Sequence, residues 1–140
     1  MTPGLLRESG QIYRLPGLAE VSRTCFMKLS QIAEQLGFTA LWEPDEDREV
    51  SRGYACDMLS DVLVHAPKGA LLATLQVHLN VVAVAAQACL SGVVFTNNKK
   101  PDGHVIERAR MEKVPLFVTG MDTFTTAGRL FAVGVKGRAL

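Results

Sequence analysis

The stretch that decides the fold is residues 69–98, GALLATLQVHLNVVAVAAQACLSGVVFTNN. Its first part, residues 70–76, has the apolar density of a buried strand, and residues 93–96 form a second such segment. Residues 81–90, between the two, are rich in alanine and apolar on nearly every side, which predicts a helix that is buried all round. Asn80 precedes this helix and is a favoured N-cap residue. The stretch therefore predicts a strand–helix–strand unit with two parallel strands.

The same alternation of strand and helix patterns extends over residues 27–134. Helices are expected over residues 29–36 and 58–65, with two more beginning at Asp102 and at Asp122 or Thr123; extended segments are expected over residues 38–42, 50–56 and 116–119. Alternating elements of these lengths predict an α/β fold with a mainly parallel sheet of four to five strands and helices on both faces.

Two features concern the C-terminal part of the chain. Phe124, Ala127, Gly128 and Phe131 share one face of the last helix. Residues 135–140 follow the last apolar period and are expected to form a frayed tail.

The N-terminal residues 1–26 do not resemble the rest of the chain. Glycine and proline interrupt every apolar stretch there, so no helix or strand pattern lasts. Our hypothesis is that residues 1–26 are a disordered extension or a mis-called one, translated from a start site placed too early. Met27 would then be the initiator.

Composition excludes several classes of protein. The 140 residues are 48% apolar with a net charge of +1, and the basic residues are scattered rather than clustered as in nucleic-acid binders. No apolar run approaches the length of a membrane span, and no secretory signal is present. Three cysteines lie far apart, which argues against a disulfide framework and against zinc or iron–sulfur motifs. We expect a cytoplasmic protein without cofactor, metal, membrane or nucleic acid.

Polar residues follow the expected strands at the edge where parallel sheets bind ligands. The candidate ligand-binding residues are Gln76, His78 and Asn80 after one strand, Thr96 and Asn97 after the next, Thr119 after the last, and Asp57 and Ser60 near the start of the 58–65 helix. A histidine beside a helix N-terminus can donate to a phosphate or carboxylate. The alternative is that His78 only caps the turn or packs at an interface.

Asp57 and Asp61 are four residues apart and would share one helix face, where two carboxylates can hold a cation. The alternative is that Asp57 is the N-cap of the 58–65 helix. No third metal ligand can be located. The acidic loop 43–49 is either solvated or, with Trp42 and Tyr54 beside it, a contact surface.

Catalytic motifs are incomplete. The sequence has no G-x-x-x-x-G-K-[ST] phosphate loop, so a kinase activity is rejected. Ser60, His78 and Asp57 make a triad only on paper, because no G-x-S-x-G elbow accompanies them. His65 and His104 lie on expected helices with polar neighbours and are taken as solvated. We expect no enzyme activity.

A series of segments resembles the DRTGG domain family. The segments are GYACDMLSDVLVHAPKGALLATLQVHLNVVAVAAQA (53–88), VVFTNN (93–98), PDGHVIERAR (101–110), VPLFVT (114–119) and DTFTTAGRLF (122–131). Their order and spacing cover residues 27–133. The motif that names the family is degenerate, since Asp47-Arg48 is followed by Ser51-Arg52-Gly53 instead of a more glycine-rich stretch.

The resemblance implies a three-layer α/β/α sandwich, a regulatory or assembly role and frequent homodimerisation, with no established catalytic residue. Domains of this family occur in some phosphotransacetylases and pyrophosphatases and as small stand-alone proteins associated with iron-only hydrogenases. A similar fold occurs in the N-terminal domain of HPr kinase/phosphorylase. We therefore expect a homodimeric module that binds an anionic metabolite or nucleotide and acts on a metabolic or redox enzyme. The alternative is an assembly or accessory protein of an iron–sulfur hydrogenase complex, without a ligand of its own.

Overall fold

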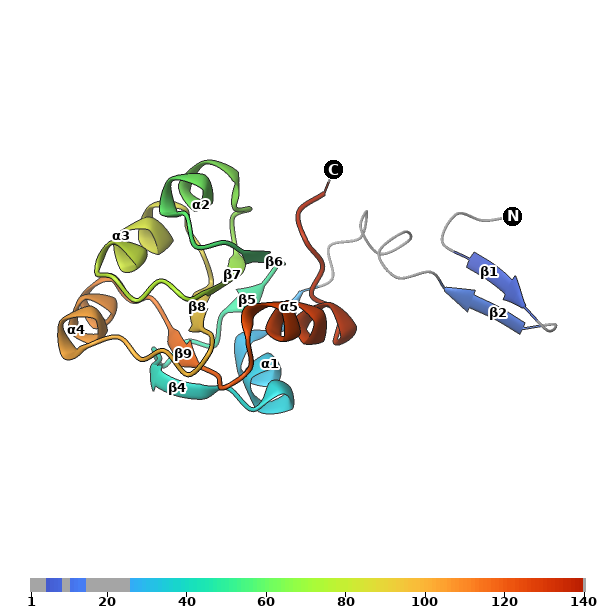
Figure 1. The fold of residues 1–140 in the computed structure, drawn as a ribbon, viewed down its shortest axis with the longest axis horizontal. Helices are drawn as coiled ribbons and strands as arrows, with labels where there is room; N and C mark the ends of the chain where they lie inside the picture. Colours follow the sequence, from blue (N-terminus) through green and yellow to red (C-terminus); the bar gives the residue numbers. More distant parts are fainter. Residues whose placement is uncertain (1–4, 9–10, 15–25, 140) are drawn as a thin grey trace.

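The computed structural model describes residues 5–8, 11–14 and 26–139 and is built on a five-stranded sheet in the order β4-β9-β8-β7-β6 (Figure 1). Four strands are parallel, namely β6 (Arg52–Ala55), β7 (Ala70–Thr74), β8 (Gly92–Phe95) and β9 (Leu116–Val118). The edge strand β4 (Thr39–Trp42) runs antiparallel to β9. The predicted mainly parallel sheet is confirmed.

Five helices cover the sheet: α1 (Leu29–Leu36), α2 (Leu59–His65), α3 (Asn80–Gln87), α4 (Gly103–Glu112) and α5 (Thr123–Ala132). Helices α2, α3 and α4 pack on one face of the sheet, and α1 and α5 pack on the other (Figure 1). A short antiparallel pair, β3 (Met27–Lys28) with β5 (Glu49–Val50), adjoins α1. The predicted three-layer α/β/α sandwich is confirmed.

Strands β7, β8 and β9 are buried on both faces. Leu72 and Phe95 point into the cluster under α2, α3 and α4, whereas Leu71, Val94 and Phe117 point into the cluster under α1 and α5. Successive side chains of a strand alternate between faces, so a strand covered on both sides needs apolar residues throughout. This is why the central strands read as continuous apolar runs in the sequence.

Helix termini agree with the sequence at three positions. Gly37 ends α1 with a φ of 72°, Asp102 caps α4 by accepting from His104 N and Val105 N, and Asp122 caps α5 by accepting from Thr125 N. The expectation for Asn80 is wrong. It is the first residue of α3, and its side chain makes no capping bond.

The structure shows which faces of α3 and α5 are buried, and the expectation for α3 is wrong. Helix α3 is not buried all round: Val81, Val82 and Ala85 are buried, and its other residues are partly or fully exposed, because only one side of the helix faces the sheet and its neighbours α2 and α4. Helix α5 buries Thr126 and Leu130 and turns the predicted Phe124 face outward.

The C-terminal residues pack on the domain, so the expected frayed tail is wrong at residues 135–137. Val135 is buried, Gly53 N donates to Lys136 O over 2.8 Å, and the Arg52 side chain donates to Gly137 O over 3.2 Å. These bonds occupy the outer edge of β6, which would otherwise expose unpaired backbone groups.

The N-terminal segment contains two strands that the sequence did not indicate, β1 (Leu5–Glu8) and β2 (Gln11–Arg14), paired with each other in antiparallel fashion. The hypothesis that residues 1–26 are an extension to the domain, with Met27 as the start, stays a prediction. Residues 1–4, 9–10 and 15–25 lie outside the described ranges. Within the described ranges, every helix is too short or too polar to span a lipid bilayer.

Asp47 and Arg48 are the residues of the family motif that this chain retains. Their side chains form hydrogen bonds to the ends of α1, α3 and α4. Asp47 accepts from the backbone and the hydroxyl of Ser30 in the first turn of α1. Arg48 donates to Leu90 O just after α3 and to Lys113 O at the C-cap of α4. One positive side chain therefore satisfies carbonyls at the C-terminal ends of two helices, where the helix dipole favours a cation.

We predict that Arg48→Ala lowers the free energy of unfolding by about 1–3 kcal/mol, because two carbonyls lose a charged donor. Urea denaturation followed by circular dichroism measures this change. Arg110→Ala is the matched control, since Arg110 is exposed and pairs only across the α4 surface with Glu107 at 3.6 Å. Equal destabilisation by the two variants would refute the role of Arg48.

Candidate functional site

The chain leaves the carboxyl edge of the sheet toward different faces after β8 and after β9. The segment after β8 leads to α4 on one face, and the segment after β9 leads to α5 on the other. Such a divergence is where open α/β sheets usually form a ligand crevice. Here the two loops are hydrogen-bonded together: Asn97 N donates to Met121 O and Asn98 N to Thr119 O, both over 2.8 Å. The crevice position between β8 and β9 is therefore closed.

Three predicted site residues are part of this closure. The hydroxyls of Thr96 and Thr123 lie 2.7 Å apart, and Thr96 is fully buried. Thr119 is buried as well and accepts from Met121 N. Asn97 has a φ of 55°, a turn conformation that asparagine tolerates. Thr96, Asn97 and Thr119 hold the loops in place and do not line the pocket described next.

A pocket of about 500 Å³ opens one strand further along, between the loop after β7 and the start of α4. It is lined by Gln76, Val77, His78, Leu79, Asp102, His104 and Val105. Gln76 and His78 thus share a cavity, as the sequence predicts, whereas Asn80 is not among the lining residues. The sequence missed Asp102 and His104. One signal in the sequence could have indicated them, because both lie at the start of α4, the helix that follows the neighbouring strand β8.

Some of the backbone N–H groups at this pocket are already bonded. The His78 Nδ1 atom accepts from Asn80 N over 3.1 Å, so His78 does cap its turn. Asp102 accepts from His104 N and Val105 N in the first turn of α4. A neutral histidine that accepts through Nδ1 carries its proton on Nε2. The side-chain donors that the pocket offers to an anion are His78 Nε2, His104 and the Gln76 amide.

Asp57 has a role that neither interpretation of the sequence anticipated. Its Oδ1 accepts from the Thr74 hydroxyl and from Leu75 N, each over 2.8 Å, so it ties the end of β6 to the end of β7. The capping position of α2 belongs to Met58, whose side chain makes no capping bond. Asp57 accepts hydrogen bonds from the end of β7, whereas Asp61 accepts one from Tyr54 of β6, so the two carboxylates point to different strands. Ser60 is not among the lining residues of the pocket. No group of three metal-ligating side chains occurs among the described residues.

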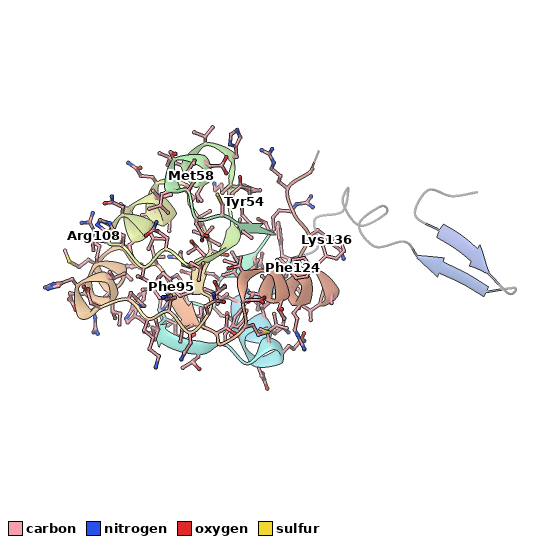
Figure 2. All side chains as sticks on the ribbon, viewed as in Figure 1. Tyr54, Met58, Phe95, Arg108, Phe124 and Lys136 are labelled. Atoms are coloured by element: carbon pink, nitrogen blue, oxygen red, sulfur yellow. The ribbon has the colours of Figure 1, made fainter. Side chains whose placement is uncertain are left out.

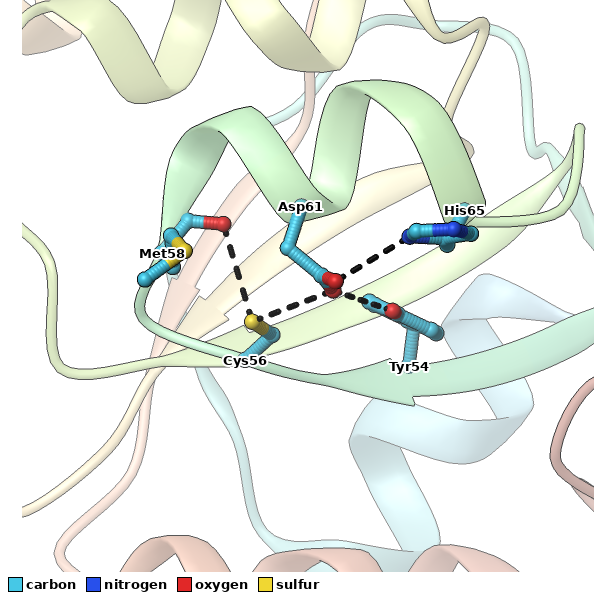
Figure 3. A network of polar contacts seen from close by, with 5 residues as sticks. All are labelled: Tyr54, Cys56, Met58, Asp61 and His65. Atoms are coloured by element: carbon cyan, nitrogen blue, oxygen red, sulfur yellow. Dashed lines mark hydrogen bonds and ion pairs between the residues drawn. The ribbon is translucent and has the colours of Figure 1, made fainter.

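A second polar cluster joins α2 to the edge strand β6 (Figure 3). The Tyr54 hydroxyl and the Cys56 thiol both donate to Asp61 Oδ2, and the Cys56 thiol also lies 3.6 Å from Met58 O. On the other side, His65 Nδ1 lies 3.0 Å from Asp61 Oδ1. Asp61 is thus the acceptor that three side chains share, and the cluster anchors α2 to β6.

The cluster shifts the titration of its members. The hydrogen bond to Asp61, followed by burial and the negative charge of Asp61, raises the pKa of Tyr54 to about 12. The same Tyr54 bond, with those from His65 and Cys56, holds the pKa of Asp61 below its usual value. Burial, and then the bond to Asp61 and the nearby carboxylates, raises the pKa of the Cys56 thiol. A thiol with a raised pKa is a weak nucleophile, so Cys56 is a packing residue.

We predict that the cluster loses stabilising free energy in alkali. A tyrosine whose pKa is higher in the folded state stabilises the fold below its unfolded value of 10.0, and this contribution is lost between pH 10 and about pH 12. Absorbance titration of the Tyr13→Phe variant isolates the Tyr54 phenolate, because the chain has two tyrosines. In the Asp61→Asn variant the Tyr54 pKa should fall toward 10.0; an unchanged pKa would contradict the assignment.

The family model described as the DRTGG domain matches residues 31–133. No curated protein matches the chain. One similar solved structure holds the CBS and DRTGG domains of the regulatory region of a Clostridium perfringens pyrophosphatase, complexed with its activator diadenosine tetraphosphate.

The match to that structure has a TM-score of 0.61 at 20% sequence identity and covers 74% of this chain. The chain spans about 45% of the length of the pyrophosphatase region. At this identity the match shows a shared fold, and the five-stranded, mostly parallel sheet with its flanking helices agrees with it. Since the family model covers residues 31–133, most of the domain described above, the chain belongs to the DRTGG domain family.

Proposed function

We propose that the protein is a non-catalytic regulatory module that binds an anionic metabolite or nucleotide in the pocket between the β7–α3 loop and α4. The observation that carries this proposal is the composition of that pocket. Val77, Leu79 and Val105 supply apolar walls, and His78 and His104 supply donors. Apolar walls with a few convergent polar groups are typical of small-molecule sites.

Charge near the pocket supports an anionic ligand. Lys99 and Lys100 are exposed in the loop between β8 and α4, directly before the Pro101-Asp102 start of that helix. Asp102 is the opposing charge, but its Oδ1 already accepts two N–H bonds. The ring N–H groups of His78 and His104 can donate hydrogen bonds to a phosphate or carboxylate.

The family supports a regulatory role over an enzymatic one. The pyrophosphatase region of similar fold is regulatory and was complexed with a nucleotide activator. By analogy, we propose that this chain acts on a metabolic or redox enzyme, as a cytoplasmic homodimer. The specific placement among hydrogenase-associated proteins and the likeness to the N-terminal domain of HPr kinase/phosphorylase are further proposals.

A second candidate is an assembly or accessory protein of an iron–sulfur hydrogenase complex. The observation that favours it is the exposure of apolar side chains at α2: Met58, the residue before the helix, is 64% exposed, and Leu63 and Val64 in its last turn are 44% and 72% exposed. Apolar side chains that form a contiguous exposed patch mark protein contact surfaces. Co-purification with iron–sulfur subunits through this surface, without any small ligand, would favour the accessory role over the sensing role.

We predict that ATP, diadenosine tetraphosphate or acetyl phosphate raises the melting temperature of the purified chain, and that His104→Gln weakens the binding roughly tenfold, the cost of one charged hydrogen bond. Isothermal titration calorimetry measures the affinity. His65→Gln is the control, because His65 lies on α2 outside the pocket. The proposal fails if none of the three compounds binds, or if both variants lose affinity equally.

A further inference from the structure

The outer face of α5 is an apolar surface without a partner in the described chain. It consists of Phe124, Ala127, Gly128 and Phe131, which we call the α5 stripe. Phe124, labelled on α5 in Figure 2, is 89% exposed. Phe131 is 38% exposed, whereas Thr126 and Leu130 of the same helix are buried. The stripe has the spacing of a packed helix face, yet Phe124 is largely uncovered, and the Lys136 ammonium group lies over the Phe131 ring. A phenylalanine this exposed costs free energy in water unless something covers it.

An apolar cavity lies beside the stripe, and Ala127 and Phe131 of the stripe are among its lining residues. It measures about 220 Å³ and lies between α5, the β6–β7 side of the sheet and the C-terminal residues. Its lining residues include Gly53, Ala55, Ala73, Leu130, Phe131 and Val135. The small side chains from β6 and β7 leave the space that larger residues would fill. An apolar cavity of about 150 Å³ holds a benzene molecule, so this cavity has room for one phenyl ring.

The α5 stripe is symmetric about its own centre. Phe124 and Phe131 are equally distant from the midpoint between Ala127 and Gly128. If two copies of α5 pack antiparallel around a two-fold axis through this midpoint, Phe124 of each copy lies against Phe131 of the other. Ala127 and Gly128 then meet at the axis. Gly128 has no atom within 4 Å of the position of a Cβ, so a second helix can approach closely there.

Charges at the ends of α5 favour this antiparallel arrangement. Asp122 caps the N-terminal end, and Lys136 lies at the C-terminal end with its ammonium group 3.9 Å from the centre of the Phe131 ring. In an antiparallel pair each Asp122 approaches Lys136 of the other copy, and the two helix dipoles oppose each other favourably. A parallel pair would bring like charges together.

We propose that α5 is the surface through which two copies of this chain associate, with Phe124 of each copy seated in the cavity beside Phe131 of the other. This inference rests on the homodimer in the proposed function and assigns its surface. The interface is isologous, because each α5 supplies both the ring and the cavity that receives it. A single helix pair buries a small area, so the dimer is expected to dissociate at micromolar concentration.

Sedimentation velocity of the full chain over a range of micromolar concentrations tests the proposal. The unmodified chain should form a dimer, and Phe124→Ser should raise the dimer dissociation constant by roughly tenfold or more, as loss of a central aromatic anchor does. Met111→Ser is the matched control, since Met111 is 73% exposed on α4, away from α5. Circular dichroism checks that both variants keep the fold.

A cross-link tests the geometry directly. Gly128→Cys, with Cys25, Cys56 and Cys89 replaced by serine, places one thiol of each copy at the two-fold axis, within the distance that a disulfide spans. Oxidation should yield a covalent dimer, and adding Phe124→Ser should reduce its yield. The corresponding Met111→Cys chain should remain a monomer on a non-reducing gel.

The outcomes separate this inference from the proposed function. A chain that stays monomeric overturns both the α5 surface and the homodimer. A dimer that Phe124→Ser does not weaken overturns the α5 surface alone, and a monomer that binds indole in the cavity assigns that space to a small molecule instead. Nucleotide titration of Phe124→Ser tests ligand binding separately, because the pocket of Gln76 and His104 shares no lining residue with the α5 cavity.

Discussion

The burial of β7, β8 and β9 on both faces is the constraint on which the rest of this structure depends. Their side chains alternate between the two hydrophobic clusters, as Leu71 and Leu72 do, so none of these strands can reach the surface without exposing an apolar face. Parallel strands in this position need helical crossovers, and α3 and α4 both provide them on the same face. All four parallel strands consequently end at one edge, where the polar residues gather.

Hydrogen bonds between loops close parts of the carboxyl edge of the sheet to a ligand. The loops after β8 and β9 are bonded together through Asn97 and Asn98, so the usual crevice position is closed. Asp57 likewise holds the ends of β6 and β7 together. Further along the loop after β7, residues 76–79 line a pocket against the start of α4. The His78 and His104 side chains are donors in this pocket that can distinguish one ligand from another.

The sequence predicted the sheet, its helices and most caps, because apolar runs and capping residues are local signals. It did not predict which way α5 faces. Phe124 and Phe131 have the periodicity of a core face, yet Thr126 and Leu130 face inward, and periodicity does not reveal whether a surface packs on its own domain or elsewhere. It also missed His104, since only the register of α4 against the β7–α3 loop brings that side chain to the pocket.

Nitrogen-15 NMR of the histidine rings tests the central claim most directly, because the chain contains three histidines and the pocket contains two of them. The account predicts that free His78 carries its proton on Nε2, and that a bound nucleotide shifts the ring signals of His78 and His104 while those of His65 stay in place. The account is contradicted if a nucleotide binds to the protein and the ring signals of His78 and His104 do not shift.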